Sequence, residues 1–272
     1  MQRSALRLFI PLLALLALVA AACGDSSDEP DDAASESTTT TTEAEEEAEE
    51  ATILVFAAAS LTDAFGELGA AFEDANPGVT VEFNFAGSSA LREQILDGAP
   101  ADVFASANNS NMETVVTEGA ASDPEVFVTN QLQIVVPAGN PGGVTGIEDF
   151  ARDELLIGLC AAEVPCGDFG RQALAAAGVE PAQDTDEPDV RSLLTKVAEG
   201  ELDAGIVYTT DVIAAGDEVE GVDIAPNVNV VAEYPIAVLT EAPEPDIAAA
   251  FMAFVLSDEG QAILASYGFG SP

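Results

Sequence analysis

The 272-residue sequence contains no histidine. This absence excludes a Ser-His-Asp triad, a cysteine nucleophile activated by histidine, and any imidazole metal site. Basic residues are scarce as well: 7 lysines and arginines stand against 49 acidic residues, for a formal net charge of −42. Twelve of the acids and two of the arginines precede Ala51, so residues 51–272 carry 37 acids, 5 basic residues and a net charge of −32. Nucleic acid and anionic lipid surfaces are therefore not expected partners of this acidic protein.

The N-terminus has the features of an export signal. Arg3 and Arg7 flank the start of an apolar run, LFIPLLALLALVAAAC, which ends in small residues before Cys23. The run is short for a membrane span, which needs about 20 apolar residues. VAAACGD resembles a bacterial lipobox, with Ala20 where such motifs usually carry leucine. Residues 1–22 are predicted to be a signal peptide and Cys23 to be lipidated; the alternative is an ordinary signal peptide with an incidental cysteine.

An acidic segment follows the cysteine. It is rich in Ser, Thr, Asp and Glu and has no aromatic side chain, so it cannot bury enough apolar surface to offset the loss of chain entropy. Residues 23–50 are therefore predicted to be the lipidated cysteine and a disordered tether. The expected location is extracytoplasmic, at the outer face of the cell membrane, which the protein contacts only through its lipid anchor.

Apolar strands alternate with helical segments after Ala51. TILVFAAA precedes a helix predicted over about 61–73, GVTVEFNFA precedes SSALREQILDG, and ADVFASA precedes a helix predicted over about 111–118. Farther on, LLIGLCA leads to GDFGRQALAAAG, and DVRSLLTKVAEG leads to LDAGIVYTT. This alternation predicts an α/β fold with largely parallel sheets.

Small polar residues stand where strands lead into helices. Ser60 and Ser88 each follow a strand, and Val190 begins a helix after Asp189. Ligands of open α/β sheets bind beyond the C-terminal ends of the strands, where helix N-termini present unpaired N–H groups and partial positive charge. Several such N-termini together can hold an anion without a cationic side chain. For each serine alone, helix capping is an alternative explanation.

A family resemblance covers nearly all of residues 52–270. It is carried by VFAAASLTDAF, FAGSSALREQILDGAPADVFASA, EVPCGDFGRQAL, DVRSLLTKVAEGELDAGIVYTTD and SDEGQAILASYGF. In order and spacing these phrases resemble the periplasmic molybdate-binding proteins of ABC importers. The resemblance implies a two-lobed, type II periplasmic-binding-protein fold, in which each lobe is a mixed sheet flanked by helices and two crossovers form the hinge. Lobe 1 is expected over residues 51–133 and 238–272, and lobe 2 over residues 134–237.

The resemblance also implies a site for a tetrahedral oxyanion, molybdate or tungstate, between the lobes. Ser60 and Ser88 would each donate a hydroxyl and a backbone N–H from lobe 1. Cys166 and Val190 would donate backbone N–H groups from lobe 2, and Tyr208 its phenolic hydroxyl. The protein would be a monomer without enzymatic activity, cofactor or directly coordinated metal. It would deliver the anion to the membrane permease and ATPase of an ABC importer.

Cys160 and Cys166, in CAAEVPC, are the cysteines of the folded region. Outside the cytoplasm they are expected to form a disulfide that closes a short loop and directs the Cys166 amide toward the ligand. The alternatives are a thiol-based metal site or a reactive cysteine, although two thiols without histidine make a poor zinc site.

Other functions stay open at this point. The ligand could be sulfate, thiosulfate or another oxyanion, since a donor-only pocket suits any fully deprotonated oxyanion. An enzyme could use Ser60 as nucleophile, and an interaction protein could keep the two lobes and have lost its ligand. Arg191 could strengthen the positive field at Val190 or point away to an acidic partner. Asp102 is expected to cap or brace a loop rather than to bind metal.

Overall fold

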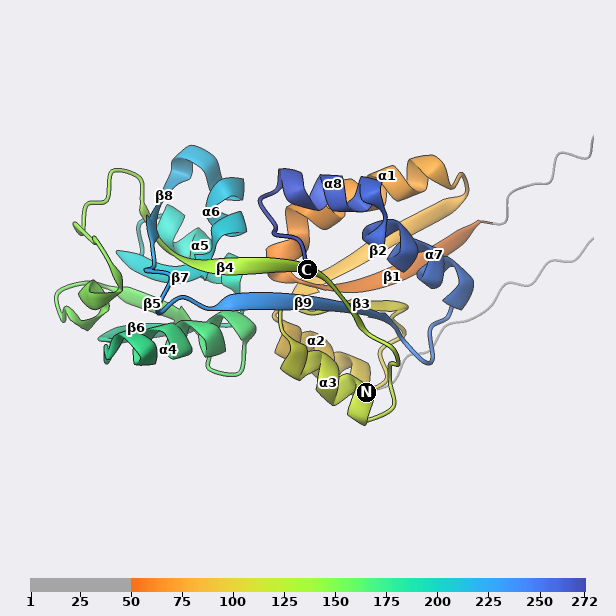
Figure 1. The fold of residues 1–272 in the computed structure, drawn as a ribbon, viewed down its shortest axis with the longest axis horizontal. Coiled ribbons are helices and arrows are strands. Elements are labelled where there is room, and N and C mark those ends of the chain that lie inside the picture. Colours follow the sequence, from red (N-terminus) through yellow and green to blue (C-terminus); the bar gives the residue numbers. More distant parts are fainter. Residues whose placement is uncertain (1–49) are drawn as a thin grey trace, which may run out of the picture. The chain divides into compact units, whose positions relative to one another are not determined.

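Two long strands, β4 (Glu125–Pro137) and β9 (Val231–Val238), lie side by side at the centre of the folded region (Figure 1). The structure is a computed structural model that describes residues 50–272; the predicted signal peptide, the lipidation at Cys23 and nearly all of the predicted tether lie outside the described residues. The strands follow the order β2-β1-β3-β9-β4-β7-β5-β6, and β8 pairs with β4.

The first lobe is built on a mixed sheet. Strand β1 (Ala51–Ala58) pairs in parallel with β2 (Val79–Ala86) and β3 (Val103–Ala105), and β3 pairs antiparallel with β9. Helices α1 (Thr62–Ala75), α7 (Pro245–Leu256) and α8 (Asp258–Ser266) lie on one side of this sheet, and α2 (Ser88–Leu96) and α3 (Asn109–Thr117) lie on the other (Figure 1).

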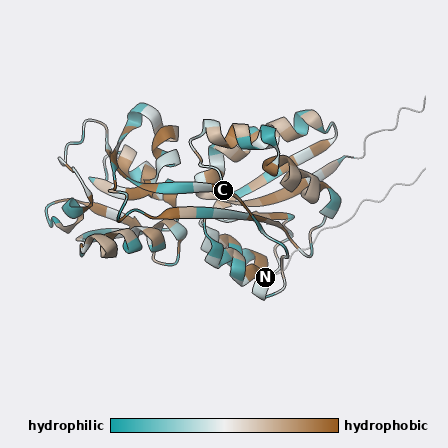
Figure 2. Cartoon of the chain, in the orientation of Figure 1, coloured by the Kyte–Doolittle hydropathy of each residue, from teal (hydrophilic) through white to brown (hydrophobic). Residues whose placement is uncertain are grey.

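Both faces of this sheet are covered, and the side chains of β1 show it. Successive residues of a strand point to opposite faces; Ile53 and Val55 pack into one core cluster, and Phe56 packs into a second cluster with residues of α2 and α3. Figure 2 shows apolar residues along the strands of both lobes.

No single helix among residues 50–272 has the length and apolar character of a membrane span. Helices α7 and α8 reach that length and character only as a pair, and the pair is bent by 62°.

The second lobe repeats the plan with different strands. Strand β5 (Ile157–Cys160) pairs in parallel with β6 (Gln183–Glu187) and β7 (Ala204–Tyr208). Helices α4 (Pro165–Ala177), α5 (Val190–Ala198) and α6 (Thr209–Ala215) follow these three strands in turn. Strand β8 (Val219–Asp223) completes the lobe. The described residues also form three short 3-10 helices: η1 (Ala59–Leu61) in the first lobe, and η2 (Ile147–Ala151) and η3 (Gly216–Glu218) in the second.

Strand β4 changes partners once along its length. Residues 125–131 pair with β9, whereas residues 132–137 pair with β7 and β8. The mixed α/β fold with two crossovers agrees with the prediction. On these pairings we propose that lobe 1 comprises residues 50–131 and 231–272, and lobe 2 residues 132–230. In these proposed bounds the second crossing lies before β9, whereas the prediction from the sequence places it at residues 237–238.

Several elements differ from the sequence-based expectations. Strand β6 was missed because its sequence, QDTDE, is polar throughout, and β8 and α6 were missed as well. The helix predicted from Asn111 begins at Asn109, because the side chain of Asn108 accepts the N–H of Asn111 and caps it.

The bracing role predicted for Asp102 is confirmed. Its carboxylate accepts the N–H groups of Leu54 and Glu244, each at 2.8 Å.

Candidate functional site

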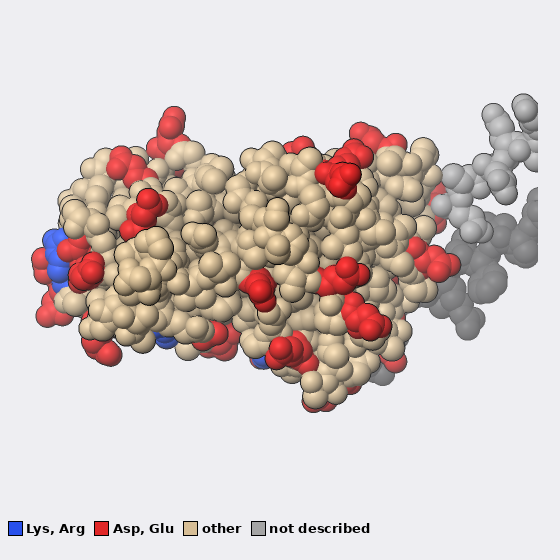
Figure 3. All heavy atoms as spheres, in the orientation of Figure 1, with Lys and Arg blue, Asp and Glu red and all other residues tan. Residues whose placement is uncertain are grey.

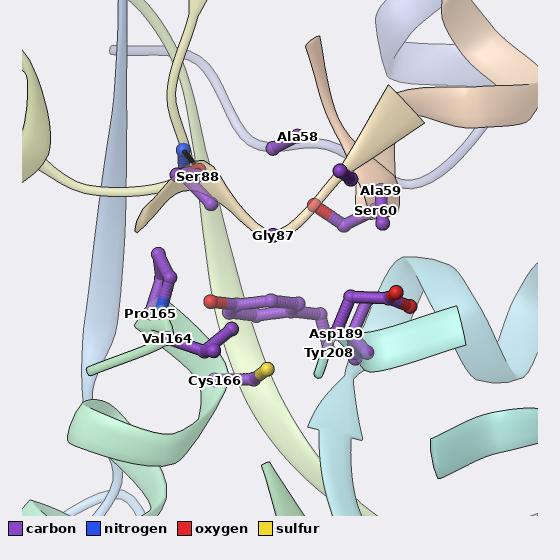
Figure 4. Close-up of a pocket in the computed structure, with 13 residues that line it drawn as sticks. Ala58, Ala59, Ser60, Gly87, Ser88, Val164, Pro165, Cys166, Asp189 and Tyr208 are labelled. Atoms are coloured by element: carbon purple, nitrogen blue, oxygen red, sulfur yellow. Dashed lines mark hydrogen bonds between the residues drawn. The ribbon is translucent and has the colours of Figure 1, made fainter. Parts of the chain in front are cut away.

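A small cavity lies between the lobes, where strands lead into helices (Figure 4). The space open to the centre of a water molecule is about 10 Å³, which is room for about one water-sized sphere. Small and apolar residues dominate its walls, which are formed by Ala58, Ala59, Ser60, Ala86, Gly87, Ser88, Ala107, Val164, Pro165, Cys166, Asp189, Val190 and Tyr208. The cavity is therefore small and nearly filled by its own walls.

Four helical segments begin at the cavity wall. Their N-cap residues are Ala58 of η1, Gly87 of α2, Val164 of α4 and Asp189 of α5. The first N–H groups of a helix have no acceptor within the helix, and its N-terminus carries a partial positive charge. Main-chain donors from both lobes therefore surround the cavity.

The structure brings all five residues that we singled out as oxyanion donors to this cavity. Ser60 and Ser88 come from lobe 1, and Cys166, Val190 and Tyr208 come from lobe 2. Each is buried. The first four occupy the first or second position of their helical segments, where the N–H group is free of helical bonding.

The hydroxyl groups at the cavity differ in their bonding. The Oγ of Ser88 accepts the N–H of Ala107 at 3.0 Å, which leaves the serine proton to be donated elsewhere. The Oγ of Ser60 lies 2.9 Å from the Oη of Tyr234 on β9, and either oxygen can be the donor. Both serines therefore have one protein partner and remaining capacity for a ligand.

Tyr208 is the exception, because its hydroxyl has no hydrogen-bond partner among the described residues although the side chain is only 1% exposed. Figure 4 shows its ring inside the cavity, with the hydroxyl oxygen between Ser88 and Pro165. Burial raises the pKa of the Tyr208 phenol well above its usual value, and the nearby Tyr234 and Asp211 reinforce the shift. The phenol therefore keeps its proton and is a buried donor without an acceptor.

Among residues 50–272, no lysine or arginine lines the cavity, and Asp189 is the one charged residue in its wall. The Asp189 carboxylate caps α5: it accepts the Ser192 N–H at 2.8 Å and the Ser192 hydroxyl at 3.1 Å. Figure 4 shows this carboxylate directed away from the Tyr208 hydroxyl. The donors at the cavity are therefore N–H groups and hydroxyls, without a cationic side chain.

The predicted disulfide is present. Cys160, at the end of β5, is bonded to Cys166 in the first turn of α4, with their Cα atoms 5.8 Å apart. The two cysteines are thus not free thiols. Gly167, which follows Cys166, lies against this loop so closely that a Cβ there would be 2.0 Å from the Ala161 carbonyl oxygen. The disulfide and the glycine together hold the start of α4 against the end of β5.

Asp211 was missed by sequence reasoning, although it stands in the phrase IVYTTD. Its side chain is fully buried; Oδ2 accepts the Tyr208 N–H at 3.0 Å, and Oδ1 lies 3.5 Å from Nε of Arg191. Burial raises the pKa of Asp211 to about 7, and the Arg191 guanidinium opposes the shift. The sequence signal that could have identified Asp211 is its position three residues after Tyr208, in the first turn of the helix that Tyr208 caps.

Gly87 lies at a close contact between the lobes in the cavity wall. A Cβ at this position would be 2.7 Å from the carbonyl oxygen of Pro188 and 3.3 Å from Cγ1 of Val164, both in lobe 2. Its φ of −59° and ψ of 136° are open to any residue. Glycine is therefore required by the contact between the lobes and not by its conformational freedom.

The sequence matches the family of bacterial extracellular solute-binding proteins over residues 53–270. The chain belongs to this family. A relative, the molybdate-binding protein ModA of Mycobacterium tuberculosis, is 41% identical over 222 residues, which cover 81% of this chain and 85% of that protein. The family consists of binding proteins, which confirms the predicted non-enzymatic role of this solute-binding protein.

Solved structures show the same architecture. The periplasmic molybdate-binding protein of Azotobacter vinelandii superposes with a TM-score of 0.72 at 21% identity, covering 81% of this chain and 99% of that one. The sulfate-binding protein SubI of Mycobacterium tuberculosis superposes with a TM-score of 0.70 at 20% identity, covering 80% of this chain and 86% of that one. These likenesses confirm the predicted two-lobed fold of the solute-binding protein.

Replacing Asp211 with asparagine should remove one component of the pH dependence of stability. The pKa of Asp211 is about 7 in the folded protein against an ordinary value of 3.8. Between these two pKa values the folded state holds a proton that the unfolded chain releases. Proton binding therefore stabilises the folded state; this contribution is complete below about pH 4 and is lost as the pH rises to 7. Relative to wild type, Asp211→Asn should gain about 1.4 kcal/mol in unfolding free energy per pH unit over this interval.

Urea unfolding followed by circular dichroism at pH 5 and pH 8 measures this difference. Asp217→Asn, a change of the same kind at an exposed residue of η3, serves as control. Parallel pH profiles for wild type and Asp211→Asn would contradict the assignment.

Replacing Gly87 with alanine should hold the lobes of the solute-binding protein apart. The new methyl group would overlap the Pro188 carbonyl, and such overpacking costs the closed state about 1–3 kcal/mol. Small-angle X-ray scattering should show a larger radius of gyration than for wild type, with an unchanged circular dichroism spectrum. Gly66→Ala, where a Cβ meets nothing within 4 Å, should leave the radius unchanged. Equal radii for both variants would refute the steric role of Gly87.

Proposed function

We propose that the protein captures molybdate or tungstate between its lobes and delivers the anion to an ABC importer. The observation that carries the proposal is the Tyr208 hydroxyl, which is buried in the cavity without a partner. A buried donor without an acceptor costs roughly 1–3 kcal/mol, and a bound oxyanion would supply the acceptor. The 41% identity to the ModA protein of Mycobacterium tuberculosis supports the choice of anion.

Each donor has a role in the proposed complex. Ser60 and Ser88 donate their hydroxyls and N–H groups from lobe 1, and Cys166 and Val190 donate N–H groups from lobe 2. Tyr208 donates its hydroxyl. The anion therefore joins donors from both lobes, so its binding energy favours the closed state over an open one.

A pocket of donors favours fully deprotonated anions. Molybdate and tungstate near neutral pH only accept hydrogen bonds, whereas phosphate retains a proton that needs an acceptor. Sulfate is the second candidate, because it meets the same rule and because the sulfate-binding SubI shares the fold. Selection of molybdate or tungstate over sulfate would then depend on size, since the larger oxyanion fills a wider cage.

The acidity of the protein does not prevent anion binding at this site. The net charge of residues 51–272 is −32, and Figure 3 shows acidic side chains dispersed over the face that it draws. At physiological salt the Debye length is about 8 Å, so exposed carboxylates beyond that distance are largely screened. N–H and hydroxyl groups in direct contact, inside a closed cavity, act in a lower dielectric and dominate.

The place of action in this proposal is the outer face of the cell membrane. Lipidated Cys23 anchors the chain, and the acidic segment up to residue 50 acts as a tether. The protein works as a monomer and hands its anion to a membrane permease driven by an ATPase. The family of extracellular solute-binding proteins is consistent with a location outside the cytoplasm.

Isothermal calorimetry of the purified protein with molybdate, tungstate, sulfate and phosphate tests the proposal. We expect one-to-one binding of molybdate or tungstate, with sulfate at least about 100-fold weaker, a gap of roughly 2.7 kcal/mol. Ser60→Ala combined with Ser88→Ala should abolish most of the affinity. Absence of binding with all four anions would contradict the proposal and favour an interaction protein that has lost its ligand.

Tyr208→Phe gives a sharper test, because it separates binding from folding. Loss of a hydrogen bond to a charged group should weaken molybdate binding by about 1.5–3 kcal/mol. The unfolding temperature should stay equal or rise, since the variant removes an unsatisfied buried hydroxyl. Tyr267→Phe, which removes a hydroxyl bonded to Glu67 at 2.8 Å within lobe 1, should leave binding unchanged. Unaltered molybdate affinity in Tyr208→Phe would exclude the hydroxyl as a ligand donor.

A further inference from the structure

Arg191 reaches from one lobe to the other. It belongs to α5 of lobe 2, directly after the cavity residue Val190. Its guanidinium is paired with the carboxylate of Asp63 on α1 of lobe 1. Its Nε donates to the carbonyl oxygen of Ala59, at 3.3 Å. One side chain therefore bonds both a charged group and the main chain of the opposite lobe.

No other ion pair among residues 50–272 joins the lobes defined above. The remaining pairs link residues of the same lobe: Arg92 with Glu93, Arg152 with Asp149 and Glu154, Arg171 with Asp186, and Lys196 with Glu187. Residues 51–272 contain 5 basic residues, and one of them is placed across the cleft.

The lobe 1 contacts of Arg191 lie beside the cavity. Ala59 lines the cavity and precedes Ser60 in η1, and Asp63 lies in the first turn of α1, which follows η1 directly. Arg191 does not line the cavity; it faces a separate groove of about 500 Å³ outside it. Its contacts therefore act on the segments that carry the donors and not on the ligand position.

A third contact holds the guanidinium in place within its own lobe. The Oδ1 of Asp211 lies 3.5 Å from Nε of Arg191, and Asp211 is fully buried. Because α5 and α6 belong to lobe 2, this contact does not depend on closure. Asp211 can therefore keep Arg191 directed toward lobe 1 before the lobes meet.

We propose that Arg191 is an interlobe latch, a positioning residue whose bonds to Asp63 and the Ala59 carbonyl form on closure and slow the release of the bound anion. The slowing of release rests on the proposed oxyanion function, whereas the effect on closure does not. The alternative, that Arg191 attracts the dianion by its positive field, is disfavoured because the Asp63 carboxylate already faces its charge.

The two roles affect different rate constants. A contact present only in the closed state lowers the dissociation rate and leaves the encounter with the anion unchanged. A field that attracts the anion raises the association rate instead. The Arg191 and Asp63 side chains are 27% and 42% exposed, so salt should weaken their pairing.

Asp63→Asn and Glu67→Gln form a matched pair for the test. Each removes one negative charge from α1, but Glu67 accepts a hydrogen bond from Tyr267 within lobe 1. In stopped-flow experiments with molybdate, Asp63→Asn should raise the dissociation rate about two- to fivefold over Glu67→Gln at low salt. The association rates of the two variants should agree. High salt should raise the dissociation rate of wild type and remove most of the difference.

Arg191→Gln should raise the dissociation rate of molybdate above that of wild type. Arg191→Lys should raise it less, because lysine keeps the charge but not the forked donors. Equal dissociation rates for Asp63→Asn and Glu67→Gln would overturn the latch. A faster association with Asp63→Asn would overturn it as well, because loss of Asp63 would then free the field of Arg191 to attract the anion.

A measurement without ligand separates the latch from the proposed function. Distances between spin labels on the two lobes, recorded in ligand-free protein, should shift toward longer values in Asp63→Asn but not in Glu67→Gln. Identical distance distributions would refute the latch even if molybdate binds. Absence of molybdate binding to wild type, together with a shifted distribution in Asp63→Asn, would refute the oxyanion function and leave the effect of the latch on closure intact.

Discussion

Main-chain N–H groups at the starts of four helical segments face one small cavity, and they can approach an anion closely only where side chains leave room. The rest of the site follows from this constraint. Alanines stand at the end of β1 and glycine at the start of α2 because larger side chains would cover the donors or separate the lobes. No basic side chain of the described region lies in the wall, so the positive potential there comes from helix N-termini and hydroxyls.

The two-lobed fold makes this site conditional on closure. Neither lobe carries all the donors, and β4 and β9 are the strands that connect the sheets of the two lobes. A separated pair of lobes would expose each set of N–H groups to water, which satisfies them at no cost. Closure would remove that water, and the Tyr208 hydroxyl is then a buried donor without a partner among the described residues.

Contacts in the cavity wall and beside it set how the lobes meet. Gly87 lets the main chains approach, the disulfide and Gly167 hold the start of α4, and Arg191 connects α5 to η1 and α1. Such contacts influence ligand binding even where they do not involve the ligand itself. They act through the positions of the helix starts, because an N–H group displaced by a fraction of an ångström donates a weaker hydrogen bond.

The sequence by itself determined the local elements and the types of donor. Alternating apolar strands and helices predicted the α/β class, small residues after strands marked Ser60 and Ser88, and two cysteines outside the cytoplasm predicted the disulfide.

Only the tertiary structure decided the contacts between lobes. Asp63 and Arg191 lie 128 positions apart, and Gly87 meets Pro188 through a contact that no local pattern encodes. Strand β6 could not be recognised from the sequence for a related reason. Its polar residues form a strand because they pair with β5, which is a long-range interaction. Local periodicity reports which face of an element is buried, whereas the orientation of two lobes about a hinge depends on all their contacts together.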